Sequence, residues 1–105
     1  MEYKHLVDKL VSEQKKIEEH IEKDMAGQEL PPDLVAKRQG ALAWFAEADK
    51  KIGTEEVAEL VPNIDPVLDY STKLDYYSHM FSEKTQSEIT EFAEHVRALF
   101  EMVKE

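Results

Sequence analysis

Hydrophobic positions recur every three to four residues over three long stretches of the chain, the spacing of amphipathic helices. The first stretch predicts a helix from residue 3 to residue 25. Its apolar stripe consists of Tyr3, Leu6, Val7, Leu10, Val11, Ile17, Ile21 and Met25. The second predicts a helix that starts near Pro32 or Asp33. Its stripe consists of Leu34, Val35, Ala41, Leu42, Phe45, Ala48 and Ile52.

Glycine and proline mark the ends of these helices. Gly27 and Gly53 each follow an apolar stripe directly, in the position where glycine commonly ends a helix. Thr54 is a suitable N-cap for a short helix over 55–61, which Pro62 would end. Pro66 then suits the first turn of the next helix.

The third stretch permits two interpretations, because its apolar positions stay in phase with one gap at Thr85. They are Val67, Tyr70, Leu74, Tyr77, Phe81, Ile89, Phe92, Val96, Leu99 or Phe100, and Val103. Two helices broken within residues 82–85 are one interpretation, which the capping-box sequence of residues 85–88 favours. A continuous helix over 65–104, about 58 Å long, is the other. We predict the continuous helix, since no Gly, Pro or Asn lies within 82–85.

A helix of that length would outrun its neighbours within one chain. Its exposed apolar residues would then need a second chain to cover them. The predicted fold is therefore all-α: an antiparallel helical bundle of three to four main helices plus a short helix near 55–61, forming one domain over 1–105 and completed by homodimerisation.

Composition restricts the chemistry. The chain has 105 residues and no cysteine, so disulfides, zinc–thiolate sites and thiol nucleophiles are excluded. No run of 18 apolar residues and no signal-peptide pattern is present, so we expect a cytoplasmic protein without a membrane segment. The net charge of −10 argues against direct binding to nucleic acid or anionic lipid.

The charge is uneven along the chain. Residues 1–53 carry nine basic and eleven acidic residues, whereas residues 54–105 carry four and twelve. An acidic helical surface can imitate a phosphate backbone, so one alternative function is an inhibitor of a DNA- or RNA-binding protein. The acids concerned are Glu55, Glu56, Glu59, Asp65, Asp69, Asp75, Glu83, Glu88, Glu91, Glu94 and Glu101.

A second alternative is a metal-binding bundle, because histidines with acids three or four residues away can supply ligands on one helix face. The clearest case is Asp75, His79 and Glu83, spaced four residues apart. So many acids are present that such spacing arises readily by chance, and we predict neither a metal nor another cofactor. No nucleophile elbow or glycine-rich phosphate loop occurs, so we expect no catalytic residues and no enzyme.

An aromatic cluster near the middle of the third stretch is the remaining candidate. It comprises Tyr70, Tyr76, Tyr77, Met80 and Phe81. Tyr77 and Phe81 follow the core stripe, whereas Tyr76 and Met80 fall on a neighbouring face. Tyr and Met are frequent in interfaces. The sequence thus predicts a non-enzymatic module that binds a protein, itself or a regulatory partner, through this cluster.

Overall fold

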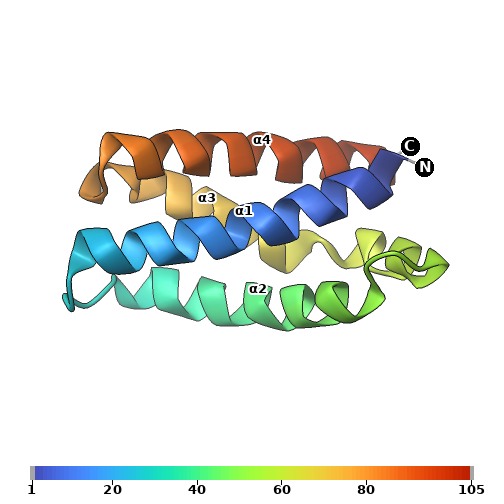
Figure 1. Cartoon of the computed structure of the whole chain (residues 1–105), viewed down its shortest axis with the longest axis horizontal. Coiled ribbons are helices and arrows are strands. Elements are labelled where there is room, and N and C mark those ends of the chain that lie inside the picture. The colour runs from blue at the N-terminus through green and yellow to red at the C-terminus, as the bar shows by residue number, and fades with distance from the viewer. Residues whose placement is uncertain (1, 105) are drawn as a thin grey trace.

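Residues 2–104 form four antiparallel α-helices, with short turns between the first and second and between the third and fourth, and a longer connection between the second and third (Figure 1). The computed structural model describes residues 2–104, and the side chains of residues 4–102. The helices are α1 (Glu2–Met25), α2 (Pro32–Lys51), α3 (Asp65–Tyr76) and α4 (Glu83–Lys104). Three short 3-10 helices lie between them: η1 (Glu55–Glu59), η2 (Val61–Asn63) and η3 (Ser78–Met80). No strand occurs within residues 2–104, so the all-α prediction is confirmed.

The helices pack in a ring-like order. α1 lies along α4, α4 along α3, and α3 along α2, while α1 and α2 touch less extensively (Figure 1). The molecule measures 39 × 22 × 20 Å, with a radius of gyration of 13.4 Å. About 13 Å is expected for a single globular chain of this length.

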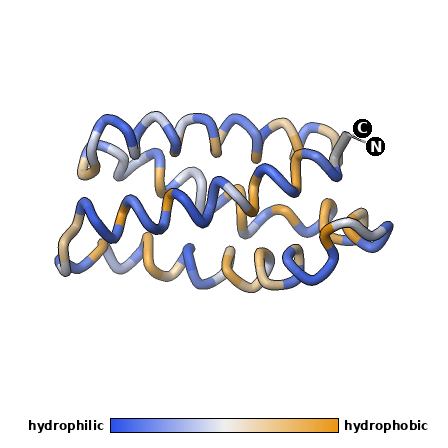
Figure 2. Tube along the Cα trace, in the orientation of Figure 1, coloured by the Kyte–Doolittle hydropathy of each residue, from blue (hydrophilic) through white to orange (hydrophobic). Residues whose placement is uncertain are grey.

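Most of the predicted stripes of the first two helices lie in the core, although Val35 and Leu42 are only half-buried and do not belong to it. Val7, Leu10 and Ile17 of α1 are at most 1% exposed, as are Leu34 and Ala41 of α2. In Figure 2 the hydrophobic turns of α4 lie on its edge toward the rest of the bundle, with hydrophilic positions along the outer edge. Tyr3 and Val103, which the pattern assigns to the core, lie outside the described side chains.

Both predicted glycine stops adopt the left-handed backbone that favours glycine. The φ angles of Gly27 and Gly53 are +88° and +84°. The Thr54 side chain accepts a hydrogen bond from the backbone N–H of Glu56, as expected of an N-cap. The segment it caps is the 3-10 helix η1, which is a tighter turn than the predicted α-helix.

The prediction of one continuous helix over 65–104 is wrong. The chain turns between Tyr76 and Glu83, and α3 and α4 pack against each other. At Tyr77 φ is −95° and ψ is 7°, and at Phe81 φ is −113° and ψ is 169°. These values are accessible to any L-residue, so the turn needs no glycine. The absence of Gly, Pro and Asn therefore did not exclude a break.

The turn also removes the reason for expecting a dimer. Because α4 folds back on α3, Phe81, Ile89, Phe92, Val96 and Leu99 are all at most 5% exposed within one chain. A second copy is not needed to cover this stripe. Within the described residues, no helix is long and apolar enough to cross a membrane.

Candidate interaction site

One end of the bundle carries both the α1–α2 and the α3–α4 turns (Figure 1). Asp24, near the end of α1, joins them. Its carboxylate accepts hydrogen bonds from the backbone N–H and hydroxyl of Ser82, both at 3.1 Å, and from the Thr85 hydroxyl at 2.7 Å. The Ser82 hydroxyl in turn accepts from the Thr85 backbone N–H at 3.3 Å. Ser82 therefore caps α4, and a carboxylate from α1 holds this cap in place.

A second carboxylate joins α2 to α3 at the same end. Asp33 accepts a hydrogen bond from Lys73 Nζ at 3.0 Å and from the Tyr77 hydroxyl at 2.9 Å. The Tyr77 ring meets the Tyr76 ring edge-on, with centroids 4.9 Å apart, and Lys73 Nζ lies 5.8 Å from the Tyr76 centroid. These contacts fix the Tyr76 ring without burying it.

The structure divides the predicted interaction cluster into two groups. Tyr70 and Phe81 are 2% and 5% exposed, so they belong to the core. The prediction that these two residues line an interaction surface is therefore corrected. Tyr77 is half-buried against the core, and its hydroxyl donates a hydrogen bond to Asp33. Tyr76 and Met80 are 68% and 39% exposed and are the large hydrophobic side chains that the described part of the chain presents to solvent. We call these two residues the Tyr76–Met80 surface.

The proposed metal ligands are not brought together. Asp75 lies on α3, His79 on η3 and Glu83 at the start of α4, all exposed, so they share no helix face. Within the described residues, no three His, Asp or Glu side chains are grouped closely enough to hold a metal ion.

Two histidines pair between helices and not with the acids of their own helix. The Nδ1 atom of His20 on α1 contacts the carboxylate of Glu88 on α4. In the second pair the histidine is on α4 and the acid on α1: Nδ1 of His95 lies 2.9 Å from both carboxylate oxygens of Glu13. Because both pairs connect α1 with α4, they add polar contacts to this helix pair.

Several acids of the second half are also paired with bases of the first half. The ion pairs are Glu55 with Lys4, Glu59 with Lys51, and Asp69 with Lys37. A phosphate-like surface requires carboxylates that are free to meet a basic partner. These pairs therefore reduce the support for an acidic mimic of nucleic acid.

Comparison of the chain with known protein families, with curated proteins and with solved structures finds no match.

Three carboxyl groups among the described side chains have lowered pKa values. Hydrogen bonds from the Thr85 hydroxyl and the Ser82 backbone lower the pKa of Asp24. Hydrogen bonds from Lys73 and Tyr77 lower the pKa of Asp33, and Lys4, at 2.8 Å, lowers the pKa of Glu55. Two of the three groups tie the helices together at the end that carries the Tyr76–Met80 surface.

We expect acid to destabilise the protein. A carboxyl group whose pKa is lower in the folded state stabilises the fold above its unfolded pKa of about 4. This contribution disappears as the pH falls through the folded pKa. The unfolding temperature should therefore decline below about pH 4. Thermal unfolding monitored by circular dichroism between about pH 2 and pH 7 measures this decline of the unfolding temperature.

The Asp24→Asn variant isolates the α1–α4 tie in this experiment. It should be less stable than the parent at neutral pH, and the difference should shrink toward low pH, where Asp24 of the parent is also protonated. Asp75→Asn is the matched control, because this side chain makes no hydrogen bond within the described residues. A constant difference between Asp24→Asn and the parent over the whole pH range would contradict the assignment.

Proposed function

We propose that the protein acts by binding another protein at the Tyr76–Met80 surface. The observation that carries the proposal is the exposure of these two large side chains at a turn whose position is fixed. Tyrosine and methionine are enriched in protein interfaces. An aromatic residue that is already held in place loses little conformational entropy on binding, which suits a hot spot.

The surroundings of the surface indicate the chemistry of the partner. Asp75 directly precedes Tyr76, and Glu83 follows Met80 by three residues. Both carboxylates are exposed, and the chain carries a net charge of −10. A complementary partner presents an apolar side chain flanked by Lys or Arg. Two exposed side chains make a small contact, so we expect a transient complex that weakens with salt.

Self-association through the same surface is the alternative. Two copies related by a twofold axis would bring Tyr76 of one copy near Met80 of the other, since such an interface uses one patch twice. The like charges of the two chains oppose this arrangement. Light scattering after size-exclusion chromatography distinguishes the cases, because a 12.2 kDa monomer at all concentrations would overturn self-association.

Photocrosslinking in cells tests the proposal. A benzophenone amino acid replaces Tyr76 or Met80. Lys50, in the last turn of α2 and so at the end of that helix away from the α1–α2 turn, provides the control position. Both sites at the turn should crosslink the same partner, and the control should not. The purified partner should then bind Tyr76→Ala at least about tenfold more weakly, the loss of a typical hot spot.

Stability is the check on this affinity measurement. Because Tyr76 and Met80 are both exposed, Tyr76→Ala and Met80→Ala should each change the free energy of unfolding by no more than about 0.5 kcal/mol. A partner that binds both variants as tightly as the parent would overturn the proposal. Crosslinking only to a second copy of the chain would establish self-association in its place.

A further inference from the structure

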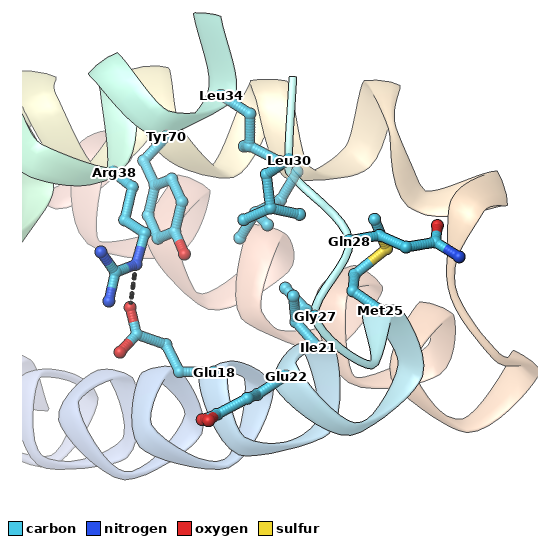
Figure 3. Close-up of a pocket in the computed structure, with 11 residues that line it drawn as sticks. Glu18, Ile21, Glu22, Met25, Gly27, Gln28, Leu30, Leu34, Arg38 and Tyr70 are labelled. Atoms are coloured by element: carbon cyan, nitrogen blue, oxygen red, sulfur yellow. Dashed lines mark hydrogen bonds and ion pairs between the residues drawn. The ribbon is translucent and has the colours of Figure 1, made fainter. Parts of the chain in front are cut away.

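A cavity of about 300 Å³ lies beside the α1–α2 turn, between α1, α2 and α3 (Figure 3). This volume is at the lower end of the range for small-molecule sites, about 300–1,000 Å³. The floor is apolar. Its buried side chains are Ile21, Met25, Leu34 and Leu74, and half-buried Leu30 from the turn completes the wall. Such a lining favours an apolar ligand group.

Tyr70 places a polar group within this apolar site. Its side chain is 2% exposed, and Figure 3 shows the hydroxyl projecting into the space between the Arg38–Glu18 pair and Leu30. The hydroxyl has no hydrogen-bond partner among the described residues. Because burial raises its pKa, the hydroxyl stays protonated and able to donate a hydrogen bond. No described side-chain N or O atom is both buried and unpaired, so the hydroxyl is open to solvent through the cavity. A ligand acceptor can therefore replace water as its hydrogen-bond partner.

The charged rim of the cavity determines the charge of the ligand. Arg38 Nε donates a hydrogen bond to Glu18 at 2.7 Å, which offsets the charge of the guanidinium. Glu22 also lines the cavity and repels anions. A cation would lose its hydration against the apolar floor, with only the solvent-exposed Glu22 to offset that cost. An uncharged molecule meets neither cost.

We propose that this cavity binds a small, uncharged amphipathic molecule: an apolar ring or short chain with one hydrogen-bond acceptor, such as a carbonyl oxygen, that receives the hydrogen bond of Tyr70. The apolar part occupies the floor formed by Ile21, Leu34 and Leu74. This site is separate from the Tyr76–Met80 surface, so it does not depend on the function proposed above.

Acetophenone and ethylbenzene are matched probes for the acceptor, since they differ by a carbonyl in place of a methylene group. Amide chemical shifts of the ¹⁵N-labelled protein report the dissociation constant of each. The hydrogen bond from Tyr70 should offset the cost of removing the carbonyl from water, so acetophenone should bind at least as tightly as the more hydrophobic ethylbenzene. The shifted signals should belong to residues that line the cavity.

Tyr70→Phe is the decisive variant. It should weaken acetophenone binding by about tenfold and leave ethylbenzene binding unchanged. Its unfolding midpoint should not fall, because the hydroxyl it removes bonds to no described residue. Tyr76→Phe is the matched control, since Tyr76 does not line the cavity. Leu30→Phe fills the space and should abolish binding of both probes.

Several outcomes would overturn the proposal. Acetophenone binding that Tyr70→Phe leaves intact, or acetophenone binding much weaker than that of ethylbenzene, would exclude the hydrogen bond. The absence of binding by both probes up to their solubility limit would show that the cavity takes no such ligand. Tighter binding of benzoate or benzylamine than of acetophenone would show that the ligand is charged.

Discussion

Phe92→Ala is expected to lower the free energy of unfolding by about 3–5 kcal/mol, the usual cost of removing a buried aromatic ring. Phe92 is fully buried in α4. Its ring centroid lies 6.2 Å from that of Phe45 on α2 and 6.4 Å from that of Tyr70 on α3. The substitution therefore leaves a cavity where three helices meet.

Urea unfolding measures this loss, with the single tryptophan, Trp44, as the fluorescent probe. A domain of this size has only about 5–15 kcal/mol of stability, so the variant should unfold at much lower urea concentration. Glu91→Ala is the control on the same helix: its side chain is exposed, and its effect should stay within about 0.5 kcal/mol. A loss below about 1 kcal/mol for Phe92→Ala would show that the three helices do not share this contact.

Trp44→Ala should cost a similar amount, about 3–5 kcal/mol, but for a second reason as well. Trp44 is 5% exposed, and its ring meets Phe45 edge-on at 5.2 Å. In addition, its indole N–H donates a hydrogen bond to the carbonyl oxygen of Leu60 at 3.0 Å. Leu60 lies between η1 and η2, so this bond anchors the long connection between α2 and α3.

Trp44→Phe separates the two contributions, because it keeps an aromatic ring and removes the donor. We expect a loss of about 1–3 kcal/mol from the unpaired Leu60 carbonyl, in addition to that of the smaller ring. Circular dichroism measures the stability, and amide hydrogen exchange should accelerate first within 55–63. Uniform acceleration across all four helices would show instead that the connection has no local stability of its own.

Periodicity predicted the first two helices because burial repeats with the pitch of the helix. Gly27 and Gly53 were correctly predicted as stops because each adopts a positive φ, a requirement that the residue type itself reveals. Where the local sequence determines the backbone, sequence reasoning was sufficient.

The α3–α4 turn was missed because its determinant is a tertiary contact. Thr85 appeared as a gap in the apolar stripe, yet it is 1% exposed and bonded to Asp24, which is 61 residues earlier in the chain. Ser82 and Thr85 are both common near helix N-termini, and this signal was present in the sequence. The carboxylate that completes the cap could be identified only from the packing of α1 on α4.

The candidate sites likewise differ in whether the local sequence or the tertiary packing determines them. Exposure of Tyr76 and Met80 agrees with their position off the core stripe, so the sequence separated them from Tyr77 and Phe81. The cavity was not predicted, since Ile21, Leu34 and Leu74 appear in sequence as ordinary core positions. Only the helix arrangement reveals that they leave a space beside the hydroxyl of Tyr70.

The pairing of α1 with α4 also sets the order in which the fold can be completed during synthesis. α1 is synthesised before α4, yet it packs chiefly against α4 and only weakly against its neighbour in sequence, α2. Its apolar stripe therefore lacks its main partner until the 22-residue α4 has emerged. A nascent chain that stalls before α4 would expose this stripe and the α4-facing side of α3 together, which makes it a target for chaperones.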